Sequence, residues 1–109
     1  MEDKTLKRAI ESAGCWFVAH YTSEVLNNYP SLETNRAFKK SFTQTIFEKE
    51  QRDRTIGGTQ TRINSLMKIV RINKVPEAME YIIQSKRLNQ EDPKSVEMAK
   101  DMLRKFNSQ

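Results

Sequence analysis

Two adjacent glycines, Gly57 and Gly58, stand in the middle of a chain that contains only three. Three arginines surround them in the sequence: Arg52, Arg54 and Arg62. Glycines at the start of a helix let the backbone amides turn toward an anion, and the first turn of a helix adds unpaired N–H groups and about half a positive charge. This pattern predicts a phosphate-binding turn just before a helix.

A polar stripe follows the glycines at helical spacing, with Gln60, Asn64, Lys68 and Arg71 expected on the outer side of that helix. Amide, lysine and arginine side chains contact phosphates and hydrogen-bond to base edges. The candidate nucleic-acid-binding residues are Lys39, Lys40, Arg52, Arg54, Gly57, Gly58, Gln60, Arg62, Asn64, Lys68 and Arg71. An alternative stays open, because two glycines are also typical of an ordinary helix connection and every soluble helix exposes polar residues.

The charge distribution supports an anionic partner. The 109 residues carry a net charge of +5, and the basic excess lies in residues 36–74, whereas residues 1–35 are net acidic and residues 75–109 are neutral. A positive charge gathered in one part of a chain attracts phosphate polymers, acidic protein surfaces or anionic lipid.

Residues for catalysis or metal binding are sparse. His20 and Glu24 lie one helical turn apart, but a catalytic zinc needs three protein ligands. Cys15 is the only cysteine, so a disulfide within the chain is excluded and the thiol is expected to pack as a small core residue. No nucleophile elbow, phosphate-loop lysine or dinucleotide glycine pattern is present. We therefore expect no metal, no cofactor and no enzymatic activity.

Hydrophobic periodicity predicts an all-α fold, a compact bundle of about five helices in a single domain over residues 1–109. The expected helices are 3–28, 32–54, 60–72, 76–88 and 93–106. Residues 42–47 also suit a strand by composition, but no second strand is available to pair with them.

Prolines, glycines and capping residues set the expected boundaries. The first helix is expected to continue through Gly14 and to end before Pro30, because the residue preceding a proline is pushed out of the α region. The later helices are expected to begin at caps or prolines, namely Ser31, Thr59 or Thr61, Pro76, and Asp92 followed by Pro93.

These observations predict a small, cytoplasmic, non-enzymatic protein that binds nucleic acid, DNA or RNA, through the phosphate backbone. The alternative is a helical adaptor or inhibitor that docks on the acidic surface of a larger protein. A homo-oligomer is a third possibility, because Trp16 and its neighbours make the middle of the first helix apolar on all sides. No run of about eighteen apolar residues is present, so no membrane association is expected.

Overall fold

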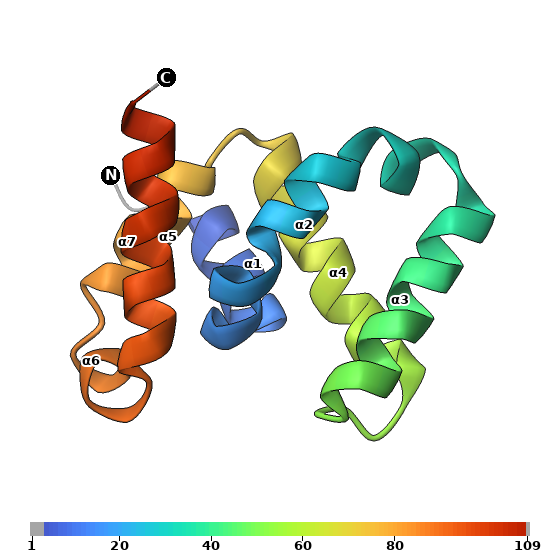
Figure 1. Ribbon diagram of the computed structural model, residues 1–109, viewed down its shortest axis with the longest axis horizontal. Coiled ribbons are helices and arrows are strands. Elements are labelled where there is room, and N and C mark those ends of the chain that lie inside the picture. Colours follow the sequence, from blue (N-terminus) through green and yellow to red (C-terminus); the bar gives the residue numbers. More distant parts are fainter. Residues whose placement is uncertain (1–3, 109) are drawn as a thin grey trace.

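The computed structural model describes residues 4–108, and this part of the chain forms seven α-helices and no strand (Figure 1). The helices are α1 (Lys4–Ala13), α2 (Cys15–Thr34), α3 (Arg36–Glu50), α4 (Ile56–Arg71), α5 (Val75–Ile83), α6 (Lys86–Glu91) and α7 (Pro93–Asn107). The all-α prediction is confirmed, including a helix at residues 42–47. The count of five is wrong, because two expected helices are each divided into two. Residue 3, where the first helix was expected to begin, lies outside the described residues.

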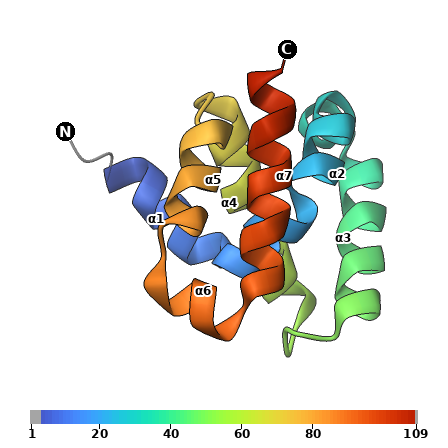
Figure 2. The ribbon, with the colours of Figure 1, turned by 60° about the vertical axis from the view of Figure 1, so that its left-hand side comes forward.

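Helix α2 lies at the centre and contacts α1, α3, α4, α5 and α7. Helix α4 lies between α1 and α3 in both views and contacts each of them (Figures 1 and 2). The core is one cluster of buried side chains to which all seven helices contribute, whereas α3 buries only Thr43 and Ile46. Across residues 4–108, no helix combines the length and apolar character needed to cross a bilayer. The arrangement places α1, α4 and α3 side by side, with α3 at the edge of the molecule.

The first expected helix is broken at Gly14, whose φ of 87° lies in the left-handed region that side chains disfavour. Gly14 donates to the carbonyl of Ile10 at 2.8 Å and ends α1, and α2 begins at the next residue. The chain therefore changes direction, and α1 packs against α4. The prediction of a continuous helix is wrong because a glycine inside an apolar pattern does not reveal which φ it adopts.

The predicted end before Pro30 is also wrong, because α2 continues through Pro30 to Thr34. Pro30 is exposed, and the turn that follows is held by local contacts. The Tyr29 hydroxyl donates to Glu33 at 2.7 Å, and Leu32 is buried in the core at 2 % exposure. Burial of Leu32 stabilises this turn despite the hydrogen bond that proline cannot donate.

Helix α3 consequently begins at Arg36 rather than near residue 32, and its cap is Asn35 rather than Ser31. The Asn35 side chain accepts a hydrogen bond from the Phe38 amide at 3.0 Å, which satisfies one unpaired donor of the first turn. The helix ends at Glu50, and the next residue, Gln51, adopts a left-handed φ of 52°. It is therefore four residues shorter at its C-terminus than the predicted 32–54.

Helix α4 begins at Ile56, so both glycines lie inside its first turn and not before it. The cap is Thr55, whose hydroxyl accepts a hydrogen bond from the Gly58 amide at 3.4 Å, and not Thr59 or Thr61. Its inner face is formed by Ile63, Leu66, Met67 and Ile69, with Val70 half-buried.

The predicted helix 76–88 is divided into α5 and α6, because Ser85 caps a new helix by accepting a hydrogen bond from the Leu88 amide at 3.2 Å. Pro76 lies in the first turn of α5, as predicted. The start of α7 is also confirmed, since Asp92 accepts a hydrogen bond from the Ser95 amide at 3.2 Å and Pro93 is the first helical residue.

Candidate functional site

The glycine pair is close to a carboxylate of the chain itself. The Asp53 carboxylate accepts a hydrogen bond from the Thr59 hydroxyl at 2.8 Å. It also lies against Gly58, where a Cβ atom would stand 3.1 Å from the Cβ of Asp53. A carboxylate at the first turn of a helix interacts favourably with the positive end of its dipole. Asp53 thus occupies the place at which the sequence predicts a phosphate.

Arg62 is tied to the same carboxylate. Its Nε lies 3.1 Å from both oxygens of Asp53, and its Nη1 donates to the carbonyl of Ala13 at 2.8 Å. The side chain is 31 % exposed, and its Nε and Nη1 are occupied by Asp53 and Ala13 rather than being free for a phosphate beside the glycine pair. Arg62 joins the end of α1 to the loop before α4 and acts as a structural residue.

The other two arginines near the glycine pair, Arg52 and Arg54, have different surroundings. The Arg52 guanidinium lies 3.6 Å from the centroid of the Trp16 ring, which is a cation–π contact. The ring of His20 is also stacked on the Trp16 ring, at a centroid distance of 4.6 Å. Arg54 is exposed in the loop. Arg52 and Arg62 line one small cavity of about 10 Å³, but Glu50 and Asp53 line it as well and Arg54 does not. The structure therefore does not gather all three arginines around a site for an added anion.

The outer stripe of α4 is partly occupied by contacts with neighbouring helices. Asn64 accepts a hydrogen bond from the Lys39 ammonium of α3. Arg71 forms an ion pair with Glu33 at 2.6 Å. The Arg71 guanidinium and then the Tyr29 hydroxyl donate to the Glu33 carboxylate and lower its pKa from the usual value. Arg71 is therefore already neutralised by the chain.

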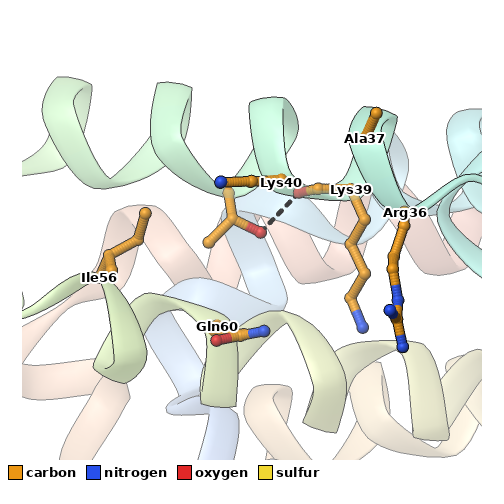
Figure 3. Close-up of a pocket in the computed structure, with 7 residues that line it drawn as sticks. Arg36, Ala37, Lys39, Lys40, Ile56 and Gln60 are labelled. Atoms are coloured by element: carbon orange, nitrogen blue, oxygen red, sulfur yellow. Dashed lines mark hydrogen bonds between the residues drawn. The ribbon is translucent and has the colours of Figure 1, made fainter.

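A groove of about 740 Å³ lies between α3 and α4 (Figure 3). Its lining residues are Arg36, Ala37, Lys39, Lys40, Thr43, Ile56 and Gln60. In the close-up, the side chains of Arg36 and Lys39 extend from α3 toward α4, and Gln60 lies on the α4 side. We call this the basic groove, because three of its lining residues are cationic and none is a carboxylate.

The cations of the basic groove are placed where they destabilise their own helix. Arg36 is the first residue of α3, and Lys39 and Lys40 follow at i+3 and i+4. Like charges at this spacing destabilise a helix by about 0.2–0.5 kcal/mol per pair, and cations near a helix N-terminus oppose its dipole. The first turn of α3 contains no acidic residue, and no ion pair within residues 4–108 involves these three cations. A bound anion would relieve both kinds of repulsion.

Three of the predicted residues therefore meet in one place, since Lys39, Lys40 and Gln60 all line the basic groove. Lys68 lies on another side of α4, in a groove shared with α1. Sequence reasoning missed Arg36 as a site residue. The signal was present, because Arg36, Lys39 and Lys40 share one helical face at i, i+3 and i+4.

Within residues 4–108, no group of three or more histidine, cysteine, aspartate and glutamate side chains is placed to hold a metal ion. Burial raises the pKa of the Cys15 thiol, which favours its protonated form. A comparison of the chain with protein-family models, curated protein sequences and solved structures found no match in any of the three. The function must therefore be argued from the chemistry of the basic groove.

Proposed function

We propose that the protein binds the phosphate backbone of nucleic acid in the basic groove, without catalysing a reaction. The observation that carries this proposal is the gathering of Arg36, Lys39 and Lys40 in one groove that has no carboxylate in its lining. Their mutual repulsion costs stability, and the fold gains no ion pair from them in return.

The chemistry of the remaining lining residues suits a nucleic acid better than a simple anion. Gln60 offers an amide that both donates and accepts hydrogen bonds, whereas the hydroxyl hydrogen of Thr43 is already donated to the Lys39 carbonyl at 2.7 Å. Ala37 and Ile56 add apolar surface that a sugar or a base can contact. Cationic and amide groups beside apolar surface are typical of grooves that follow a nucleic-acid strand.

The proposal is tested by substituting Lys40 with Gln and measuring binding to random-sequence DNA and RNA by fluorescence anisotropy over a range of salt concentrations. Losing one phosphate contact should make the negative slope of log K against log salt less steep by about 0.7–0.9. It should also weaken binding about five- to eightfold at ~0.1 M salt. The matched control is Lys49→Gln, the same change on the same helix at an exposed position outside the groove. Equal losses in both variants would contradict a specific role for the groove.

An acidic protein segment is the second candidate occupant, because carboxylates would pair with the same three cations. A gel shift with the native protein alone distinguishes an acidic protein segment from a nucleic acid as the occupant. If neither DNA nor RNA is retained at low salt in a gel shift, the nucleic-acid proposal fails. Affinity capture from nuclease-treated lysate, compared between native protein and Lys40→Gln, would then test for a protein partner.

A further inference from the structure

A second, smaller groove lies between α1 and α4. It has a volume of about 250 Å³ and is lined by Thr5, Arg8, Ala9, Ser12, Ser65 and Lys68. Its lining combines two cations with three hydroxyls and contains no carboxylate. Because α4 lies between α1 and α3, this groove and the basic groove flank the same helix (Figures 1 and 2).

The polar groups of the second groove are largely available to a ligand. Arg8 and Lys68 are exposed, and neither takes part in an ion pair in the part of the chain that the structure describes. The Ser65 hydroxyl donates to the Ser12 oxygen at 2.9 Å, which leaves the Ser12 hydroxyl hydrogen free to donate outward. A guanidinium, an ammonium and a hydroxyl donor that line one small groove are suited to phosphate oxygens.

We infer that the groove between α1 and α4 is a second phosphate site and that it acts together with the basic groove on one nucleic acid. This inference rests on the proposed function, since it assigns both grooves to the same ligand. The volume is about one third of that of the basic groove, which suits one phosphate group rather than a longer segment. The nucleic acid then passes across the exposed side of α4, where Asn64 and Lys68 lie.

If both grooves bind the same nucleic acid, the affinity should depend on the length of that nucleic acid. Once the first groove is occupied, the second phosphate binds as part of the same molecule, at a high effective concentration. A nucleic acid long enough to reach both grooves therefore binds more tightly than a short one, whereas inorganic phosphate gains nothing from the second groove.

The experiment measures anisotropy with oligothymidylates of increasing length and with a duplex of random sequence, for the native protein, Arg8→Gln and Lys68→Gln. Each substitution should weaken the binding of the long ligands about five- to eightfold at ~0.1 M salt. The binding of the shortest oligothymidylate should stay unchanged, because it fills only the basic groove. The matched control is Lys7→Gln, the same loss of charge on the neighbouring residue of α1, which is exposed but does not line the groove.

The pattern of losses also identifies the form of the nucleic acid. A loss that grows along the oligothymidylate series supports a single strand crossing α4, and a loss confined to the duplex supports two strands on either side of that helix. Losses no larger than those of Lys7→Gln would overturn the second site. That result would leave the proposed function intact if Lys40→Gln still weakens binding, whereas a native protein that binds none of these ligands would refute both.

Discussion

The Nε of Arg62 lies 3.1 Å from both carboxylate oxygens of Asp53, and the same guanidinium donates through Nη1 to the carbonyl of Ala13, a residue 49 positions away. One side chain thereby joins the loop before α4, α4 itself and the end of α1. This junction ties together α1 and α4, the two helices that line the second groove.

The first prediction concerns that junction. Replacing Arg62 with Gln should lower the free energy of unfolding by about 1–2 kcal/mol, because a partly buried charge-assisted network is lost and Asp53 keeps an uncompensated charge. The control is Arg54→Gln, an exposed arginine of the same loop, for which we expect a change within about 0.5 kcal/mol. Urea unfolding measures the free energy of unfolding of both variants. A double-mutant cycle with Asp53→Asn should give a coupling energy clearly above zero.

The second prediction separates two glycines by their backbone conformations. Gly14→Ala should destabilise the protein by about 1–3 kcal/mol, because φ is 87° and the new Cβ would stand 2.6 Å from Nη1 of Arg62. Gly57→Ala should instead stabilise it by about 0.5–1 kcal/mol, because Gly57 is helical and the nearest atom, the Thr55 hydroxyl oxygen, is 3.6 Å from the added Cβ. Thermal unfolding of the two variants should show opposite shifts, and a stable Gly14→Ala would contradict the described junction.

The third prediction concerns pH. Burial, and then the nearby charge of Lys94, lower the pKa of His20 from the usual 6.5, although Asp92 and Glu50 oppose the shift. The unfolded chain therefore takes up a proton at a higher pH than the folded one, so the unfolding free energy should decrease as the pH falls below 6.5. Denaturant unfolding between about pH 5 and pH 7.5 measures this effect.

The control for that measurement is His20→Gln, whose side chain does not titrate. The Nε2 atom of His20 is buried without a hydrogen-bond partner, so the substitution removes no bond made through it. The stability of the native protein relative to His20→Gln should be lower at the acidic end of the range. A difference that stays constant with pH would show that His20 titrates alike in the folded and unfolded states.

The fourth prediction concerns the ion pair of Arg71 with Glu33. Because Glu33 already neutralises Arg71, Arg71→Gln should weaken nucleic-acid binding less than Lys40→Gln does. Glu33→Gln should strengthen binding and steepen its salt dependence, because it releases the Arg71 guanidinium and removes a negative charge close to Lys39. Anisotropy titrations at two salt concentrations distinguish the variants. A Glu33→Gln protein that binds like the native one would place Arg71 outside the nucleic-acid contact.

Much of the secondary structure follows from local signals. The apolar spacing of Ile63, Leu66 and Met67 marks the inner face of α4, and Asp92 followed by Pro93 marks the start of α7. Such signals depend on residues within one or two turns, so they can be recognised without knowledge of the tertiary contacts. The face formed by Arg36, Lys39 and Lys40 depends on an equally local spacing, although only Lys39 and Lys40 were predicted as site residues.

The composition of the grooves, in contrast, depends on which segments the folded chain brings together. In the sequence, Arg8 belongs to the net acidic segment 1–35. In the fold, the turn at Gly14 brings α1 beside α4, so that Arg8 and Lys68 line the same groove. Arg62 is predicted from the sequence to contact a phosphate, but packing directs its guanidinium to Asp53 and to the carbonyl of Ala13. Hydrophobic periodicity determines that helices form and which face each one buries. The φ of a single glycine and the burial of helix against helix decide which charged side chains meet, because those contacts join residues far apart in the sequence.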